Sequence, residues 1–188
     1  MPPVADRTSK GFCVWLTGLS GSGKSTLASE LAARLAADKR PVTVFDGAGD
    51  PGEGREDRHA NVIAMASRAA RVVADGGIAI CTLISPYDES RQEARALVGA
   101  DRFVLVYVCT PLSVCETRDV HGWYDRARRQ EIRNFVGVEE VFEVPRDADV
   151  LIDTSLSIVS IRLLLTVLVR RGYVRAEALA APELPGKR

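Results

Sequence analysis

Residues 18–25 read Gly18-Leu19-Ser20-Gly21-Ser22-Gly23-Lys24-Ser25, a complete G-x-x-x-x-G-K-S pattern. An apolar stretch at 12–17 precedes it, and residues 26–35 follow with leucines at helical spacing. A glycine loop between a strand and a helix turns several backbone N–H groups toward one anion, and the helix N-terminus adds a partial positive charge. The pattern predicts a phosphate-binding loop for ATP or GTP, in which Lys24 reaches the β- and γ-phosphates and Ser25 ligates Mg²⁺.

The composition is that of one ordinary domain and argues against several classes of function. The chain has 188 residues, enough to enclose a substantial core. Its 25 basic residues balance 25 acidic ones and only 6% of residues are aromatic, which disfavours nonspecific nucleic-acid binding. No apolar run is long enough to cross a bilayer, and the N-terminus lacks the apolar segment of a signal peptide. We therefore expect no nucleic-acid and no membrane partner.

The cysteines give no sign of a disulfide or metal framework. No two of them form a C-x-x-C pair; they are Cys13, Cys81, Cys109 and Cys115. Three fall in expected strands, where cysteine behaves as a small buried apolar residue. Reduced structural thiols in a cytoplasmic protein are favoured, and we expect a cytoplasmic location.

Short apolar strands alternate with amphipathic helices along the chain. Strands are expected near residues 12–17, 42–45, 78–83, 103–108 and 149–153. Helices are expected near residues 24–37, 57–75, 88–98, 111–117 and 157–171. Five such strands with helical crossovers predict an α/β fold, a doubly wound parallel five-stranded sheet of the P-loop kinase type.

The sequence predicts a single folded unit. It contains no internal repeat and no inter-domain linker, so we expect one P-loop kinase domain over residues 11–175. Residues 1–10 are expected to form a flexible N-terminal arm. Residues 176–188, which include two prolines and a glycine, are expected to form a flexible C-terminal tail.

Polar residues at the carboxyl ends of the expected strands face the same crevice as the glycine loop. Asp46 ends the second strand and could polarise an acceptor hydroxyl or hold Mg²⁺ through water; a turn-forming aspartate is the alternative. Arg58 and Asn61 are three residues apart and share one helix face, where they could contact an anion and a base or ribose. The alternative for this pair is a solvated helix start.

The segment after Leu83 ends another strand at this crevice. Pro86 forces an extended backbone on Ser85, which would present the backbone of Ile84 and Ser85 to a ligand. A plain strand-exit turn is the alternative.

The stretch 118–137 is dense in charge and includes five arginines, Arg118, Arg126, Arg128, Arg129 and Arg133. Arginines in a mobile lid neutralise the charge of a transferring phosphoryl group when the lid closes. We expect one or two of them to reach the nucleotide and assign this role to Arg118 and Arg128. An ordinary solvated charge run is the alternative.

Four stretches together resemble the adenylylsulfate (APS) kinase family. They are the opening run 11–28, E-D-R-x-x-N at 56–61, I-S-P-Y at 84–87, and the run 106–135, which matches the family's lid region. Ile152-Asp153-Thr154 closes the pattern. The resemblance spans residues 11 to 155 and is more specific than the glycine loop alone.

The resemblance implies transfer of the ATP γ-phosphoryl group to the 3′-hydroxyl of APS, giving PAPS, with Mg²⁺. It implies that the glycine loop and Thr26 bind ATP, that Lys24, Asp46 and Ser85 act catalytically, and that Ser25 and Asp46 hold the metal. Ser85 matches a serine described as a phosphoserine intermediate, although direct in-line transfer needs only positioning and charge stabilisation. The residues implied to contact APS are Arg58, Asn61, Ile84, Ser85, Pro86, His121, Asn134 and Phe135.

The sequence departs from the family pattern on the acceptor side. Asp46-Gly47-Ala48 stands where the family has D-G-D, and the stretch that follows is shorter than in the family and lacks a segment whose phenylalanine lines the pocket. Ile63 and Ala64 replace a pair of arginines, and His121 replaces a lysine. Because members of the family are typically dimers, a homodimer is also expected.

Three functions follow from this pattern. The first is an APS kinase of sulfate activation. The second is a kinase of the same fold that phosphorylates a different small molecule or nucleotide conjugate, since losing polar partners weakens substrate binding strongly. The third is a nucleotide-binding regulatory protein without turnover, which Ala48 favours and the intact Lys24, Ser25 and Asp46 oppose.

Overall fold

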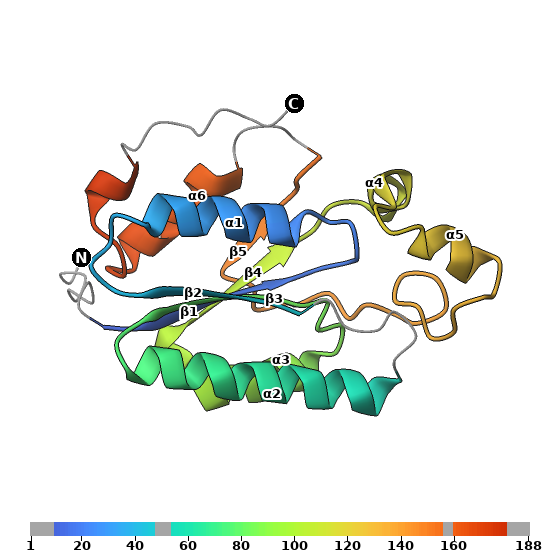
Figure 1. Ribbon diagram of the computed structural model, residues 1–188, viewed down its shortest axis with the longest axis horizontal. Coiled ribbons are helices and arrows are strands. Elements are labelled where there is room, and N and C mark those ends of the chain that lie inside the picture. The colour runs from blue at the N-terminus through green and yellow to red at the C-terminus, as the bar shows by residue number, and fades with distance from the viewer. Residues whose placement is uncertain (1–9, 48–53, 156–159, 180–188) are drawn as a thin grey trace.

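The computed structural model describes residues 10–47, 54–155 and 160–179. Their centre is a five-stranded parallel sheet with the strand order β2-β3-β1-β4-β5 (Figure 1). The strands are β1 (Phe12–Thr17), β2 (Val42–Asp46), β3 (Ile78–Thr82), β4 (Phe103–Val108) and β5 (Val150–Ile152). The predicted α/β fold with a parallel five-stranded sheet is confirmed, and each strand lies where the sequence indicated.

β1 is the central strand, and all six of its residues are buried. In the parallel register, Trp15 lies opposite Cys81 of β3 on one side and Leu105 of β4 on the other. A strand that is covered on both faces needs apolar side chains on both, so its sequence reads as a continuous apolar run. This position holds the start of the glycine loop in the middle of the sheet edge.

Two helical layers cover the sheet. One face carries α1 (Lys24–Leu35) and α6 (Ser160–Arg170), and the other carries α2 (Arg55–Ala74) and α3 (Asp88–Val98) (Figure 1). Alternate residues of β1 serve the two cores: Val14 packs on the α1 side and Trp15 on the α2 side. The short helices η1 (Ala100–Arg102) and η2 (Ala176–Leu179) are of the 3-10 type.

Beyond β4 the chain leaves the sheet and forms α4 (Leu112–Arg118) and α5 (Trp123–Arg128), which project past the carboxyl edge of the sheet (Figure 1). We call residues 112–140 the lid segment. It has a small core of its own, which consists of Cys115, Tyr124, Ala127, Ile132 and Phe135. Leu19 of the glycine loop packs against this core, so the lid segment rests on the phosphate-binding loop.

The helix α5 is a difference from the sequence expectation, which placed no helix within 118–137. Its six residues are too few to show a helical repeat, and only Tyr124 and Ala127 among them are buried. At the C-terminus, Ala178 and Leu179 of η2 pack against the sheet core. Residues 1–9 and 180–188, which hold most of the expected arm and tail, lie outside the described residues, so the domain limits stay a prediction.

Within the described part of the chain, none of the helices combines the length and the apolar character needed to cross a membrane.

Candidate active site

The phosphate-binding loop has a backbone that only glycine allows at three points. Gly18, Gly21 and Gly23 have φ values of 149°, 72° and 96°. A Cβ at Gly18 would lie 2.5 Å from the carbonyl oxygen of Val108, and one at Gly23 would lie 2.9 Å from Thr154 Oγ1. A side chain at Gly18 would therefore displace the Val108 backbone or the loop, and one at Gly23 would displace the Thr154 side chain that bonds the loop.

Lys24 folds back over this loop. Its ammonium donates hydrogen bonds to the carbonyl oxygens of Gly18 at 2.9 Å and Leu19 at 2.7 Å. Removal from water lowers its pKa to about 8, and the nearby Cys115 and Asp46 oppose this shift. A bound phosphate would supply the negative charge that this site lacks, so the loop is built to gain from an anion.

Two threonines and an arginine hold the loop from the strand ends. Thr110 Oγ1 and Thr154 Oγ1 donate to the carbonyl oxygen of Ser22 at 3.0 Å and 2.7 Å. Arg118 at the end of α4 donates to the Gly21 carbonyl at 3.1 Å and to the Thr154 carbonyl at 3.0 Å. The predicted place of Arg118 beside the nucleotide loop agrees with this geometry.

Asp46 ends β2 at the same edge of the sheet and is exposed. Its Oδ1 accepts a hydrogen bond from Thr82 Oγ1 at 2.7 Å, which orients the carboxylate and leaves its other oxygen for a ligand. Gly47 follows in close packing, since a Cβ there would lie 2.6 Å from Leu83 Cγ. Ala48 and Asp50, which fall in the altered segment, lie outside the described residues.

Ser85 is buried, with 2% of its surface exposed, and has a positive φ of 39°. Its hydroxyl accepts a hydrogen bond from Trp15 Nε1 at 3.2 Å and donates one to Thr17 Oγ1 at 2.9 Å. Thr17 Oγ1 in turn donates to the Ile84 carbonyl at 2.6 Å. The Ser85 hydroxyl thus belongs to a closed internal network, which favours a positioning role over a role as a phosphate carrier. The positive φ also differs from the extended backbone expected before Pro86.

Arg58 lies in the first turn of α2 and is 7% exposed, whereas Asn61 one turn later is exposed. The guanidinium of Arg55 lies over the Tyr87 ring, 4.0 Å from its centre. Burial and the nearby Glu140 raise the pKa of the Tyr87 phenol, and Arg58 lowers it. The start of α2 and the segment 84–87 therefore lie side by side, as a shared acceptor pocket requires.

Two lid residues that were predicted to contact a ligand, Phe135 and Asn134, lie in different surroundings. Phe135 is 1% exposed and packs edge-on against Tyr124 at 5.0 Å, so its ring belongs to the lid core and not to an open pocket. Asn134 is exposed and has a φ of 56°, and its backbone N–H donates to Glu139 at 2.8 Å. The predicted contact between the Phe135 side chain and a ligand would need the lid core to rearrange.

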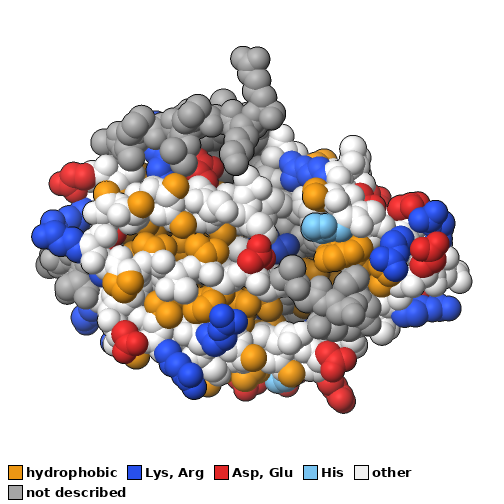
Figure 2. Space-filling model, viewed as in Figure 1, with side chains coloured by type: hydrophobic (Ala, Val, Ile, Leu, Met, Phe, Trp, Pro, Cys, Tyr) orange, Lys and Arg blue, Asp and Glu red, His pale blue; other side chains and the backbone are white. Residues whose placement is uncertain are grey.

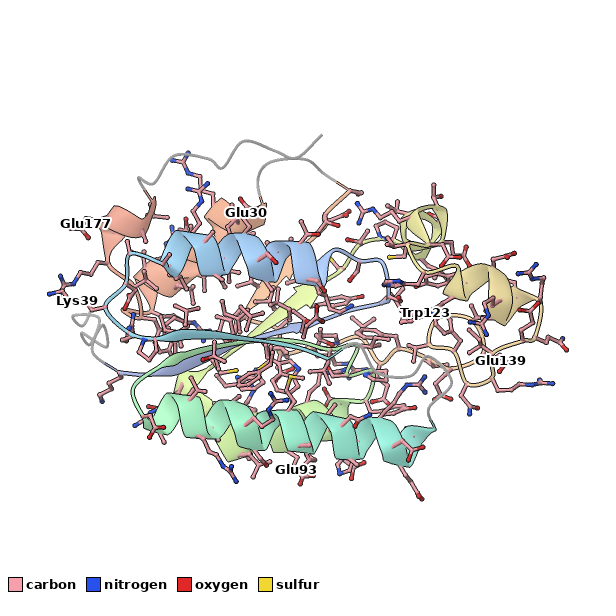
Figure 3. All side chains as sticks on the ribbon, viewed as in Figure 1. Glu30, Lys39, Glu93, Trp123, Glu139 and Glu177 are labelled. Carbon is pink, nitrogen blue, oxygen red and sulfur yellow. The ribbon has the colours of Figure 1, made fainter. Side chains whose placement is uncertain are left out.

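His121 is exposed and lies against the Trp123 ring at 4.6 Å. Figure 3 shows Trp123 on the side of α5 that faces the sheet. The Tyr124 hydroxyl donates to the Ser20 carbonyl at 2.9 Å, which ties α5 to the phosphate-binding loop. The base of α5 therefore sits next to the place where nucleotide phosphates would bind.

Charges of both signs gather on the outer end of the lid segment (Figure 2). Arg128, predicted to reach the nucleotide, pairs with Glu116 at 2.5 Å. The other outer arginines also face carboxylates; the pairs are Arg126–Glu131, Arg129–Asp125 and Arg133–Glu139. These pairs are exposed and cost little to break, so the lid could release Arg128 on closure. Of the five lid arginines, Arg118 is the one that contacts the phosphate-binding loop here.

The family model for adenylylsulphate kinase matches residues 10–153. The chain belongs to the adenylylsulphate kinase family. Its members in the comparisons include the adenylyl-sulfate kinase of Clostridium kluyveri, which is 43% identical over 156 residues, 79% of this chain and 78% of that protein. The adenylyl-sulfate kinase of Paraburkholderia xenovorans is 43% identical over 153 residues, covering 78% of this chain and 85% of that protein.

Solved structures agree with this family. The adenylylsulfate kinase CysC of Mycobacterium tuberculosis, solved with AMPPNP and APS, superimposes with a TM-score of 0.76 at 32% identity, over 86% of this chain and 97% of that one. A gluconokinase from Sinorhizobium meliloti is 18% identical with a TM-score of 0.59, which shows a shared fold alone. The chain is therefore a kinase of the adenylylsulphate kinase family.

The oxygen atoms at this site suit a magnesium ion that is bound mainly through substrate phosphates and water. Within residues 10–47, 54–155 and 160–179, no three His, Cys, Asp or Glu side chains form a metal-binding group. Mg²⁺ suits such a setting because it is commonly held by one or two protein oxygens, substrate phosphates and water. The exposed Ser25 hydroxyl and the oriented Asp46 carboxylate are the two protein oxygens that would hold the ion here.

Sequence reasoning assigned no role to two groups of residues. Thr82, Thr110 and Thr154 orient the carboxylate and the loop, yet single threonines near strand ends give no distinctive signal. Arg91 is fully buried beneath segment 84–87. A charged residue on a helix face is normally read as solvated, and only its contacts reveal otherwise.

Proposed function

We propose that this chain transfers the γ-phosphoryl group of ATP to the 3′-hydroxyl of adenylylsulfate and so forms PAPS. The observation that carries this is the complete, correctly folded phosphate-binding loop in a chain that is 43% identical to adenylyl-sulfate kinases over most of its length. The related structure solved with AMPPNP and APS holds an analogue of ATP together with the proposed acceptor. ATP is therefore the donor we propose here.

On the donor side, the glycine loop and Thr26 surround the phosphates. Lys24 exchanges its two carbonyl partners for β- and γ-phosphate oxygens. Arg118, already bonded to the loop, adds charge beside the transferring group. Ser25 would ligate Mg²⁺ and Asp46 would hold it through water, and the ion would supply neutralisation of the phosphate charge.

On the acceptor side, Asp46 stands at the strand end next to the phosphate site, and its alternative role is to accept the proton of the attacking hydroxyl on the oxygen that Thr82 does not bond. Arg58 provides a fixed cation for an anionic acceptor, and Asn61 provides an amide one turn further along α2. The backbone at Ile84, Ser85 and Pro86 forms the opposite wall. His121 and Asn134 complete the pocket when the lid segment closes, and a contact from the Phe135 ring also requires the lid core to rearrange.

Transfer is direct in this proposal. An in-line attack breaks the bond from Pγ to the bridging oxygen of ADP and forms a bond from Pγ to the acceptor oxygen, whose proton leaves to a base. A phosphorylated Ser85 would require its hydroxyl to leave Trp15 and Thr17. Ser85→Ala is therefore expected to retain turnover, because it deletes the hydroxyl and keeps the backbone.

An assay of the purified chain with ATP, Mg²⁺ and APS tests the function. We expect PAPS and ADP to form in equal amounts and ADP release to depend on APS. ATP binding with turnover only on another anionic hydroxyl compound would select a kinase of different acceptor specificity, which the altered segment after Asp46 favours. ATP binding without turnover on any acceptor would leave a regulatory nucleotide-binding protein.

We further propose a homodimer in the cytoplasm. The exposed Leu151 of β5 and Leu163 of α6, which are 59% and 42% exposed, offer apolar surface on the side of the sheet away from β2. Sedimentation velocity at several concentrations tests the dimer. A mass of one chain throughout would contradict it.

A further inference from the structure

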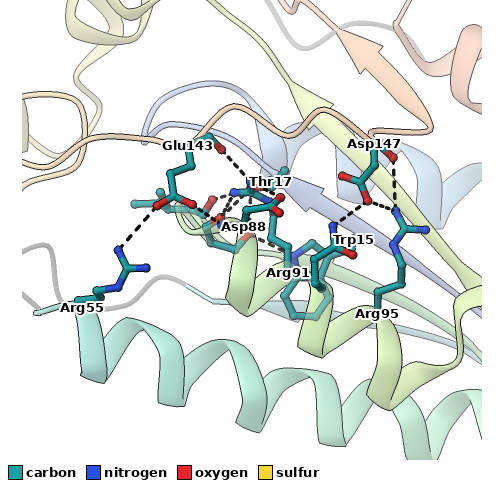
Figure 4. Close-up of polar contacts among 11 residues, drawn as sticks. Trp15, Thr17, Arg55, Asp88, Arg91, Arg95, Glu143 and Asp147 are labelled. Atoms are coloured by element: carbon teal, nitrogen blue, oxygen red, sulfur yellow. Dashed lines mark hydrogen bonds and ion pairs between the residues drawn. The ribbon is translucent and has the colours of Figure 1, made fainter.

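The most buried charge outside the phosphate-binding loop is Arg91, on the first turns of α3. Its side chain is 0% exposed. One terminal nitrogen donates to the Ser85 carbonyl at 2.8 Å, and the other donates to the Glu143 carbonyl at 2.7 Å and to Asp88 Oδ1 at 3.1 Å (Figure 4). A single guanidinium therefore connects the backbones of two segments that are far apart in the sequence.

Both segments border the acceptor pocket. Ser85 lies in the strand exit 84–87 and holds a positive φ of 39°. Glu143 lies just beyond the lid segment and makes two more bonds to the same exit. Its N–H donates to the Pro86 carbonyl at 2.9 Å, and its Oε2 accepts from the Asp88 N–H at 2.7 Å. The exit and the chain returning from the lid thus form one bonded unit, with Arg91 beneath it.

Glu143 also reaches the third wall of the pocket. Its Oε1 lies 3.7 Å from a terminal nitrogen of Arg55, which begins α2 one turn before Arg58 (Figure 4). The strand exit, the lid return and the start of α2 therefore meet at this carboxylate. A shift of the Arg91 unit would move all three walls relative to the phosphate-binding loop.

Packing alone does not explain a cation in this place. Burying a guanidinium costs free energy unless its donors are bonded, and an apolar side chain of similar volume often serves stability as well or better. The planar fork of arginine is what allows two carbonyls from different segments to be held at fixed separation. The arrangement is suited to fixing backbone geometry.

We propose that Arg91 is a positioning residue for the acceptor. It holds the Ser85 carbonyl, and with it the backbone of Ile84 and Ser85, at a fixed place relative to the chain that returns from the lid. The proposal rests on the assigned acceptor side of the proposed function. Arg91 touches neither substrate and acts through the strand exit.

The same helix provides a matched control. Arg95 lies one turn after Arg91 and also ties α3 to the returning chain, through Asp147 at 3.2 Å and Asp149 at 3.8 Å. Its side chain is 18% exposed, and it bonds neither Ser85 nor Glu143 in the described structure. Removing Arg95 therefore loosens α3 from the same chain without releasing the strand exit.

The test compares Arg91→Lys and Arg91→Leu with Arg95→Lys and Arg95→Leu. Steady-state kinetics give KM for APS and for ATP, and hydrogen exchange reports the backbone of 84–88. Because a small misplacement of a reacting group costs rate heavily, we expect both Arg91 variants to raise the acceptor KM about 10- to 100-fold while the ATP KM changes less than about threefold. Exchange at 84–88 becomes faster. The Arg95 variants leave the ratio of the two KM values unchanged.

Arg91→Lys separates positioning from stability. A lysine keeps the charge, but its single ammonium lacks the planar fork that holds the Ser85 and Glu143 carbonyls on two separate nitrogens. We expect it to fold with a Tm closer to that of the wild type than Arg91→Leu, yet to keep most of the defect in acceptor KM. If Arg91→Lys restores the acceptor KM, or if the KM values for ATP and acceptor rise together in both variants, Arg91 is structural only and the proposal fails.

If the proposed function itself is wrong, the measurements give a different pattern. A wild-type chain that forms no PAPS overturns the proposed function, and hydrogen exchange then tests the positioning role by itself. Faster exchange at 84–88 in Arg91→Lys but not in Arg95→Lys supports it. Equal exchange in these two variants overturns it.

Discussion

At the scale of single residues, the protonation of Lys24 affects both the stability of the fold and the binding of the nucleotide donor. Folding lowers its pKa from 10.5 to about 8, so between these values the unfolded chain binds more protons and this lysine makes stability rise with pH. The affinity for nucleotide has the opposite dependence on pH. We expect the affinity for ADP to decline as pH rises through about 8, approaching tenfold per pH unit, because a neutral amine cannot balance phosphate charge.

Calorimetric titration with ADP on both sides of this pKa checks the decline. The control is Lys24→Ala, which should remove phosphoryl transfer, keep the fold and lose this pH step. Normal turnover by a folded Lys24→Ala protein would exclude the donor mechanism.

Arg58 provides the test of the acceptor side at the same scale. It is 7% exposed at the start of α2, so its guanidinium is held in place and does not sample solvent freely. Arg58→Ala should raise the acceptor KM by about tenfold or more and the ATP KM much less, since a charged hydrogen bond to an anion contributes roughly 1.5–3 kcal/mol. Initial rates with each substrate varied in turn give both constants. Arg68→Ala, further along the same helix, is the control, and an unchanged acceptor KM in Arg58→Ala removes this residue from the pocket.

At the scale of elements, the turn from β1 into α1 depends on the absence of side chains. Gly18→Ala places a Cβ 2.5 Å from the Val108 carbonyl at a φ of 149°, so the loop must separate from β4. Gly76→Ala is matched, because φ is also positive there at 81° while a Cβ meets nothing within 4 Å. We expect the Gly76 variant to lose about 1 kcal/mol of stability and keep activity.

Gly18→Ala should lose ATP binding even where it folds. Thermal unfolding and nucleotide titration of the two variants measure this, and equal effects in both would mean that the close approach of β4 has no role in the loop.

The elements also show what a single sequence can predict. The strand β1 and the helix α1 are predictable because glycine pattern, apolar run and leucine spacing all indicate the same structure. Asp46 is found beside the loop because the ends of parallel strands meet at one edge. Arg118 lies there because α4, which it ends, follows β4 in the chain, and its guanidinium donates to the Gly21 carbonyl. The helix α5 escapes prediction, since six residues with two buried ones carry no period.

The internal contacts of two residues escape prediction for a different reason. The roles of Ser85 and Arg91 depend on contacts between residues distant in the sequence, with Trp15 in one case and Glu143 in the other. The sequence predicts an extended Ser85 backbone that faces a ligand, with a strand-exit turn as the alternative, and an arginine on a helix is read as solvated. Only tertiary structure shows that both are buried, so positioning roles are the part of an active site that a single sequence hides most completely.

At the scale of the whole molecule, the phosphate-binding loop and the lid segment meet at the site but are held in place in different ways. The loop is fixed to the central strand β1, which is wholly buried, and is bonded to Thr110 and Thr154. The lid segment has a separate small core and contacts the phosphate-binding loop through Leu19, Tyr124 and Arg118. We therefore expect the lid segment to move when substrates bind, and the phosphate-binding loop to stay in place.

The placement of the two tryptophans gives this protein its own optical probes. Trp15 is 0% exposed in β1, and its indole N–H is bonded to Ser85, whereas Trp123 lies in the lid segment beside His121. In Trp123→Phe, the remaining emission is that of a shielded indole, and APS should change its intensity while ADP has little effect. In Trp15→Phe, ADP should alter the emission of the lid tryptophan. Stopped-flow fluorescence of the two variants can thus time acceptor arrival and lid closure separately, without any attached dye.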